Sequence, residues 1–181
     1  WEAGFTHAVP VDAYGQHYRD ALPALLDAAH QDPGAIIGGQ PVYDTSIPAG
    51  RKIGRWFTHV WVWIETWSFQ ISDSMCGFRV YPLAATRALL AREPVGRRMD
   101  FDTDIMVRLF WAGVPVRMVP VKVIYPPDNT SNFNLLRDNV LISWMHTRLV
   151  VTGLWRWVTR TQRAPASRPW AALTESGALW G

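Results

Sequence analysis

Residues 99–125 read MDFDTDIMVRLFWAGVPVRMVPVKVIY, and this stretch carries the clearest structural signal in the chain. Its acids favour the start of a helix, which we predict from a cap at Asp102 to about Ala112. Gly113 is the predicted stop, because glycine is common directly after a helix. Residues 114–125 then read as a strand in which Pro120 indicates a bend or an edge position. A helix followed at once by a strand is typical of α/β proteins.

Similar segments alternate on both sides of this stretch. Phe57, Val60, Trp61, Ile64 and Trp67 recur at intervals of three and four residues, which predicts an amphipathic helix. The whole order of elements predicts an α/β fold with a largely parallel or mixed sheet. The predicted strands are residues 5–12, 34–43 and 77–81, and the predicted helices are residues 21–30, 52–70, 83–92 and 134–158.

Composition limits the class of protein. The chain has 181 residues, 49% of them hydrophobic, which is enough for one domain with a core. The net charge of +3 does not require a nucleic acid, although five arginines and no acid lie between Arg148 and Arg168. No run of about 18 apolar residues is present, so no membrane-spanning helix is expected.

Cys76 is the only cysteine. A single cysteine excludes an internal disulfide and a zinc site built from thiolates, and it favours a reducing, cytoplasmic setting. No catalytic cysteine–histidine pattern surrounds it, so we expect Cys76 to be a small buried hydrophobic residue.

Two motifs could carry chemistry near strand ends. Asp12 ends a predicted strand, where a carboxylate can hold a divalent cation against a diphosphate or simply form an Asx turn. Residues 73–79, DSMCGFR, combine an acid, a glycine and an arginine. Arginine suits phosphate oxygens, but Asp73 and Arg79 could equally pair to brace the turn.

Two further groups stand out. Capping explains Asp102 or Asp104 but not all three acids of residues 100–104, so one of them could act as a general base. Arg51 and Arg55 begin the tryptophan-rich helix, either as phosphate ligands or as a solvated face. The five histidines lack metal-ligand spacing, and only His17, beside the first motif, is a candidate.

Taken in order, these phrases resemble a known family. VDAYGQH (11–17), IIGGQPVYD (36–44) with RKIGR (51–55), DSMCGFRVYP (73–82) and residues 99–127 are similar to the second half of bacterial family-2-type glycosyltransferases. The branch is that of polyprenyl-phosphate sugar synthases. WVWIET, CGFRVYPL and LISWMHTRL look like the glycosyltransferases of aryl-polyene gene clusters.

The resemblance implies a Rossmann-like GT-A domain that uses a nucleotide-sugar donor with Mg²⁺ or Mn²⁺. In this family a strand ends in an Asp-x-Asp motif, followed in the similar branch by glutamine. Asp12 and Gln16 match the first acid and the glutamine, with His17 beside them on the donor side. Tyr14 stands where the second acid is expected, and a phenol with a pKa of about 10 is a poor metal ligand.

The resemblance also implies roles for the acceptor side. The FDTDIMVRL phrase matches the segment that holds the general base of inverting members, which gives this role to Asp102, with Asp104 as the second candidate. Asp73 and Arg79 match the motif that orients the acceptor. The acceptor is expected to be lipid-linked or of the polyprenyl type, and the protein to lie in the cytoplasm at the inner face of the plasma membrane.

The resemblance covers about residues 1–150. It implies that residues 1–160 are the C-terminal part of a transferase domain whose nucleotide-binding half is missing. Residues 161–181 are expected to be a linker or the start of another domain, because PWAALTESGALWG resembles the opening of lipid-A-type acyltransferases.

Two other functions stay open. Tyr14 and the missing half favour a catalytically impaired remnant. Helix 134–158 favours a peripheral membrane-docking module, because Trp144, Trp155 and Trp157 lie among arginines in it. The same helix could instead pack on the sheet with a basic rim. No nucleic-acid partner is expected.

Overall fold

A computed structural model describes residues 4–10, 21–43, 49–123 and 134–159, with only the backbone of residues 43, 49, 51 and 123. Their elements confirm the predicted α/β fold with a mixed sheet. The elements are β1 (His7–Ala8), α1 (Leu22–Gln31), β2 (Ile36–Tyr43), α2 (Ala49–Thr66), β3 (Arg79–Pro82), α3 (Leu83–Leu90), α4 (Phe101–Trp111), β4 (Val116–Val123) and α5 (Leu135–Val158).

The described strands form a sheet in the order β1-β3-β2-β4. β2 and β4 are parallel from Ile36↔Val116 to Tyr43↔Val123. β3 is antiparallel to β2 and to β1. The carboxyl ends of β1, β2 and β4 therefore point toward the end of the sheet at which β3 begins, and we call this end the carboxyl edge.

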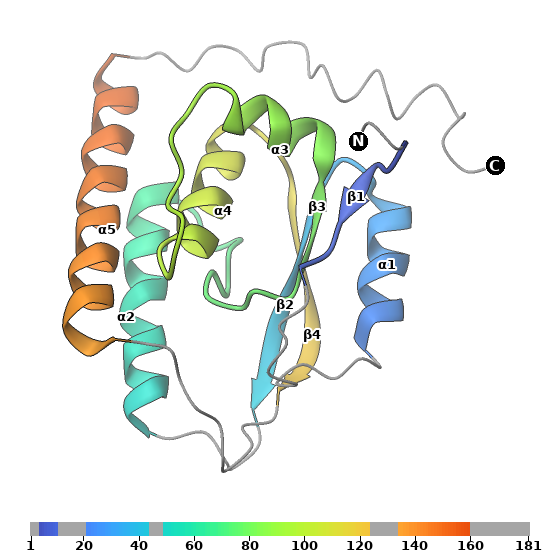
Figure 1. Ribbon diagram of the computed structural model, residues 1–181, viewed down its shortest axis with the longest axis horizontal. Coiled ribbons are helices and arrows are strands. Elements are labelled where there is room, and N and C mark those ends of the chain that lie inside the picture. The colour runs from blue at the N-terminus through green and yellow to red at the C-terminus, as the bar shows by residue number, and fades with distance from the viewer. Residues whose placement is uncertain (1–3, 11–20, 44–48, 124–133, 160–181) are drawn as a thin grey trace.

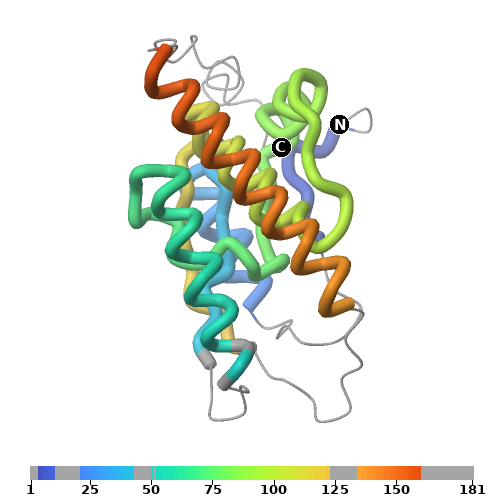
Figure 2. Tube along the Cα trace, turned by 90° about the vertical axis from the view of Figure 1, so that its left-hand side faces the viewer, coloured from blue at the N-terminus to red at the C-terminus, as the bar shows by residue number. Residues whose placement is uncertain are grey.

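The helices lie in layers around the sheet (Figure 1). α1 covers one face, where Leu25 and Ala28 are buried with Ile37, Phe78 and Val80. α3 and α4 cover the other face. α2 and α5 lie side by side beyond α4, as the turned view also shows (Figure 2). α4 is thus enclosed between the sheet and this pair of helices.

The enclosed position of α4 explains its composition. Ile105 and Leu109 pack toward Ile36 of the sheet. Met106 and Val107 belong to a second cluster with side chains of α2 and α5, among them Val62, Met145 and Leu149. Burying apolar area on both sides is the main favourable term for such a helix.

Several predicted boundaries need correction. α4 begins at Phe101, so Asp102 lies inside the first turn and is not the cap. The flanking residue is Asp100, whose side chain makes no capping hydrogen bond. Gly113 ends the helix as predicted, with a φ of 81° that glycine adopts without strain. Pro120 lies on β4, the edge strand of the sheet that the described residues form, as one of the two predicted positions has it.

Other elements differ in length from the predictions. β1 is two residues long where residues 5–12 were expected. α2 ends at Thr66, four residues early, because Trp67 adopts a left-handed backbone with a φ of 50°. α5 runs unbroken through Gly153. A side chain there would crowd Trp111, whose Cζ2 lies 3.3 Å from the position of a Cβ atom.

Polar contacts join α5 to the elements beside it. His146 Nδ1 lies 2.7 Å from Glu65 Oε1 of α2, and both side chains are buried. Trp61 stacks on the His146 ring with centroids 6.1 Å apart. Burial raises the pKa of Glu65, while the hydrogen bond from His146 opposes this change. α2 and α5 are therefore joined by specific polar contacts as well as by apolar packing.

Gly39 of β2 lies very close to the loop that precedes β3. A Cβ atom there would lie 2.8 Å from the Phe78 carbonyl oxygen and 3.0 Å from Val121. We expect Gly39→Ala to lower the free energy of unfolding by about 1–3 kcal/mol, because a backbone oxygen cannot move aside. Urea denaturation measures this change.

Gly38→Ala is the matched control for this prediction. Its Cβ atom would also come close to a neighbour, at 2.8 Å from the Met118 sulfur, but that side chain is flexible. The cost of Gly38→Ala should be smaller. Equal costs for the two variants would contradict the assigned cause.

Candidate active site

Asp73 lies in the loop between α2 and β3, near the carboxyl edge, and it is almost fully buried. Its Oδ1 accepts hydrogen bonds from the backbone N–H groups of Met75 and Cys76, each at 2.8 Å. Its Oδ2 forms an ion pair with Arg55. Asp73 therefore braces the loop through Arg55, and not through Arg79 as the sequence allowed.

Arg79 at the start of β3 is fully buried. Its Nη1 donates to the Asp102 carbonyl oxygen at 2.5 Å and to the Tyr81 hydroxyl at 3.2 Å. Its Nη2 donates to the Ser74 carbonyl oxygen at 2.5 Å. Burial opposes the charge, yet Tyr81 and Asp102 keep the pKa of the guanidinium above its ordinary value. Arg79 ties loop 73–78 to the first turn of α4.

Asp102 lies on the first turn of α4, facing the same loop, and it is partly exposed. Gly77 lies directly against its carboxylate, because a Cβ atom at residue 77 would be 3.7 Å from Oδ2. Thr103 reinforces the contact by donating to the Ser74 carbonyl oxygen at 3.1 Å. Asp102 is thus a partly exposed acid held against loop 73–78, and partial exposure is compatible with the role of a general base.

Asp104, the second candidate base, lies in different surroundings. It is fully buried and accepts from Arg108 Nε at 2.6 Å, from Arg148 Nη2 at 2.5 Å and from the Gly96 N–H at 2.9 Å. Arg108 also contacts Glu93 at 2.5 Å. A carboxylate with these partners supports the fold, so the geometry favours Asp102 over Asp104 as the base.

The other predicted residues are placed only in part. Arg55, in the second turn of α2, forms an ion pair with Asp73. The side chain of Arg51 lies outside the described residues. Asp12, Gln16 and His17 also lie outside them. β1 ends at Ala8 beside Tyr81 and runs toward the start of β3, so the described chain is heading for the carboxyl edge when it reaches Pro10.

The described acids do not fit a divalent cation by themselves. No cluster of three or more His, Cys, Asp or Glu side chains suited to a metal ion occurs among them. Asp73 and Asp104 are both engaged by arginine. The prediction of Mg²⁺ or Mn²⁺ therefore still depends on Asp12 and Gln16.

Cys76 is buried beside this loop, as predicted. Burial raises the pKa of its thiol to about 11. Since the thiolate is the nucleophilic form, Cys76 is a packing residue of the candidate site.

Comparison with known proteins leaves the family open. No family model matches the chain, and no curated protein matches it either. The glycosyltransferase assignment therefore stays a prediction from the motifs, and the arrangement of their residues is the observation that bears on it.

His59 is a neighbour of the site that sequence reasoning missed. Its Nε2 lies 3.5 Å from Asp73 Oδ2, and its Nδ1 is buried without a hydrogen-bond partner among the described residues. The sequence could have indicated this position, because His59 follows Arg55 by four residues and therefore lies on the same face of the helix. The pKa of His59 is lowered overall, mainly by burial. The charge of Asp73 acts to raise this pKa, and the charge of Arg55 acts to lower it further.

This lowered pKa predicts a pH dependence of stability. The unfolded chain binds a proton at His59 near the ordinary value of 6.5, whereas the folded chain binds it only at lower pH. Stability should therefore decrease as the pH falls below 6.5 toward the folded pKa. Urea denaturation between pH 7.5 and 5.5 measures the slope, which His59→Gln should reduce. An unchanged slope in this variant would exclude His59 as a source.

Proposed function

We propose that this chain is the catalytic C-terminal part of a nucleotide-sugar glycosyltransferase that acts on a lipid-linked or polyprenyl-type acceptor. One observation supports the proposal best. The segments around Arg55, Asp73–Arg79 and Asp102 are distant in sequence, yet they contact one another near the carboxyl edge. In α/β sheets, ligands bind at this edge.

The proposed reaction is an inverting displacement. The acceptor hydroxyl enters beside Gly77 and gives its proton to the Asp102 carboxylate. Its oxygen forms a bond to the anomeric carbon of the sugar, while the bond from that carbon to the diphosphate oxygen breaks. The nucleoside diphosphate leaves with the electron pair. An acceptor that is already an ionised phosphate would need no base, and Asp102 would then only position it.

The buried contacts would hold the base in place. Arg79 binds the carbonyl oxygen of Asp102 and that of Ser74, so it fixes the base relative to loop 73–78. Asp73 fixes the same loop from the side of α2. Positioning of this kind lowers the entropic part of a barrier. A divalent cation held with Asp12 would help to neutralise the leaving diphosphate.

Release of nucleoside diphosphate tests the proposal. The chain, alone and extended by its upstream coding sequence, is incubated with a panel of nucleotide sugars and a bacterial lipid extract. We expect release that requires both donor and acceptor. If neither protein consumes any donor, the transferase assignment fails.

Tyr14 supports one alternative, a transferase that has lost its catalysis. Tyr14→Asp restores the acid that the resemblance implies, and Mn²⁺ binding with donor consumption is measured in both forms. Activity gained only in the variant would identify an impaired transferase. Activity in the natural protein would exclude this alternative.

For either form we propose a location at the inner face of the plasma membrane.

A further inference from the structure

The outer surface of α2 and α5 is unusually apolar. Most of the large hydrophobic side chains that are exposed among the described residues lie on these two helices or just after α2. Trp56 is 56% exposed and Trp144 is 64% exposed. Many exposed aromatic and aliphatic side chains on two adjacent helices are typical of a binding surface.

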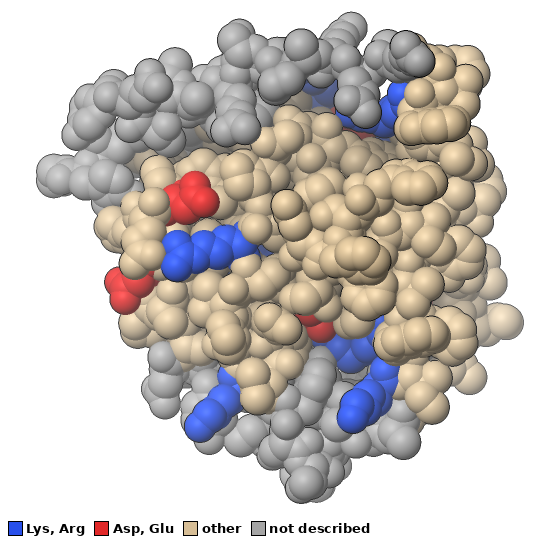
Figure 3. All heavy atoms as spheres, turned by 180° about the vertical axis from the view of Figure 1, so that it is seen from behind, with Lys and Arg blue, Asp and Glu red and all other residues tan. Residues whose placement is uncertain are grey.

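The apolar side chains that recur along α2 form a large part of this exposed surface. Thr58, Val62 and Glu65 face the interior, whereas Phe57, Trp61 and Ile64 face outward. The apolar stripe of the helix is therefore on its exposed side, the reverse of an ordinary surface helix. Seen from behind, the side of the molecule that carries α2 shows a broad area without charged residues (Figure 3).

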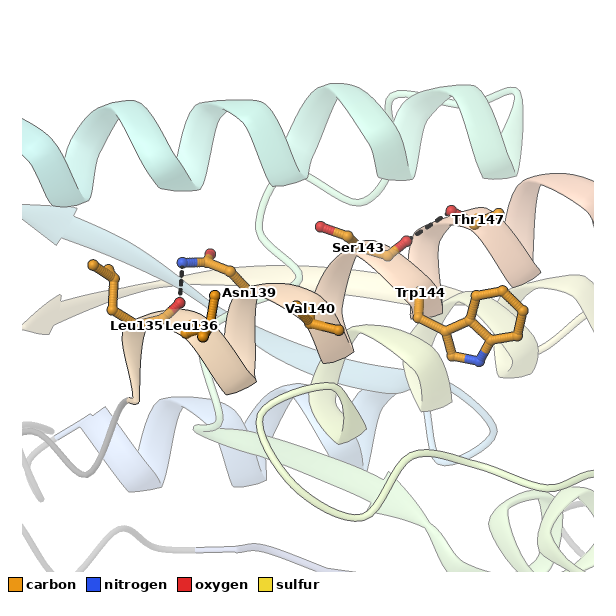
Figure 4. A pocket seen from close by; sticks show the side chains of 7 residues that line it. All are labelled: Leu135, Leu136, Asn139, Val140, Ser143, Trp144 and Thr147. Carbon is orange, nitrogen blue, oxygen red and sulfur yellow. Dashed lines mark hydrogen bonds between the residues drawn. The ribbon is translucent and has the colours of Figure 1, made fainter.

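α5, which packs beside α2, carries exposed apolar side chains of its own. A shallow hollow runs along its first half, and Trp144 points away from α2 there (Figure 4). Leu135, Leu136, Val140 and Trp144 line the hollow, while Thr147 donates its hydroxyl to the Ser143 carbonyl oxygen of its own helix. We call the outward side chains of α2 and α5 the docking face, and its aromatic members are Trp56, Phe57, Trp61, Trp144, Trp155 and Trp157.

The charges on the two helices have one sign at the surface. Their two acids, Glu65 and Asp138, are both buried. Lys52 and Arg137 are exposed in the first turns of α2 and α5. A second copy of this chain would offer the same cations on this face, with no exposed acid of α2 or α5 to pair with them. An anionic surface would complement them.

We infer that the docking face binds the surface of an anionic lipid bilayer, with α2 and α5 lying in its interfacial plane. Tryptophan is favoured at this depth because its ring is apolar and its N–H is polar. No helix among the described residues is long and apolar enough to cross a bilayer. Docking would bring the start of α2, and with it Arg55 and Asp73, close to the lipid headgroups. The binding itself does not depend on transferase activity.

Flotation of the purified chain with phosphatidylcholine vesicles, with and without phosphatidylglycerol, tests this inference. We expect flotation with the anionic vesicles and little with the neutral ones. The double variant Lys52→Gln/Arg137→Gln should weaken partitioning about 25-fold, taking about fivefold for each cation near the surface. Trp56→Ser/Trp144→Ser should abolish flotation.

Leu90→Ser is the matched control, since Leu90 is exposed on α3, outside the docking face. It should float as the natural chain does, and circular dichroism checks that every variant is folded. Failure to float overturns the inference, as does equal binding to neutral vesicles. Analytical sedimentation of the chain without lipid tests whether a second copy of the chain occupies the docking face. A dimer that Trp56→Ser/Trp144→Ser dissociates would show that a second copy occupies the face.

Discussion

Asp102→Asn should slow transfer to a hydroxyl acceptor by about 10²–10⁴-fold, the usual contribution of a general base. The variant keeps the shape of the side chain and the backbone carbonyl that Arg79 binds, so loop 73–78 stays attached to α4. The loss should therefore fall mainly on kcat. Some loss of stability is also expected, because the Asp102 charge supports the buried Arg79 guanidinium. Steady-state release of nucleoside diphosphate, together with urea denaturation, separates the two effects.

Asp100→Asn is the matched control for the base. Asp100 also lies at the start of α4, but its carboxylate accepts from the Arg98 N–H and lies beside Gly96. Its replacement should leave transfer within a few-fold of the natural rate. A loss in Asp102→Asn no larger than in this control would remove the base role. Unchanged transfer to a lipid phosphate would assign Asp102 to positioning.

Asp104→Ala should lower the free energy of unfolding by about 3–5 kcal/mol, the cost of removing one partner from a buried ion pair. The side chain of Asp104 is inaccessible to solvent, and its loss would leave Arg108 buried with only Glu93 as a partner carboxylate. The N–H of Gly96 would lose its acceptor as well. Thermal or urea denaturation measures the change.

Asp27→Ala provides the comparison for Asp104→Ala. Asp27 is exposed on α1, and removal of an isolated surface acid changes stability by less than about 0.5 kcal/mol. Equal effects of the two variants would show that the buried pairs around Asp104 contribute little. Rapid loss of transfer in folded Asp104→Ala protein would point instead to a catalytic role.

Local patterns predicted most of the elements. The helix and strand of residues 99–125 were recognisable because acids at the helix start, Gly113 and an alternating strand all agree with one another. The length of α2 was overestimated because nothing in the sequence shows that Trp67 adopts a left-handed backbone. Helical periodicity also identified the apolar stripe of α2, but periodicity cannot say whether such a stripe meets a core or a partner.

The candidate site was predictable only at the level of motifs. The sequence singled out residues of separate phrases, and of these Arg55, Asp73, Arg79 and Asp102 do lie together near the carboxyl edge. Their individual partners were not predicted. Asp73 forms its ion pair with Arg55, and Arg79 donates to backbone carbonyl oxygens. The contact between Asp104 and Arg148 spans 44 residues and depends on how α5 packs. Asp12, Gln16 and His17 stay predictions.

The Arg148–Asp104 ion pair has a mechanical consequence. Arg148 projects from α5, while Asp104 lies only two residues beyond Asp102 on α4. A tilt of α5 away from the body would have to separate two opposite charges, one of them fully shielded from water. The position of α5 is therefore linked, through one ion pair, to the turn that holds the carboxylate of Asp102.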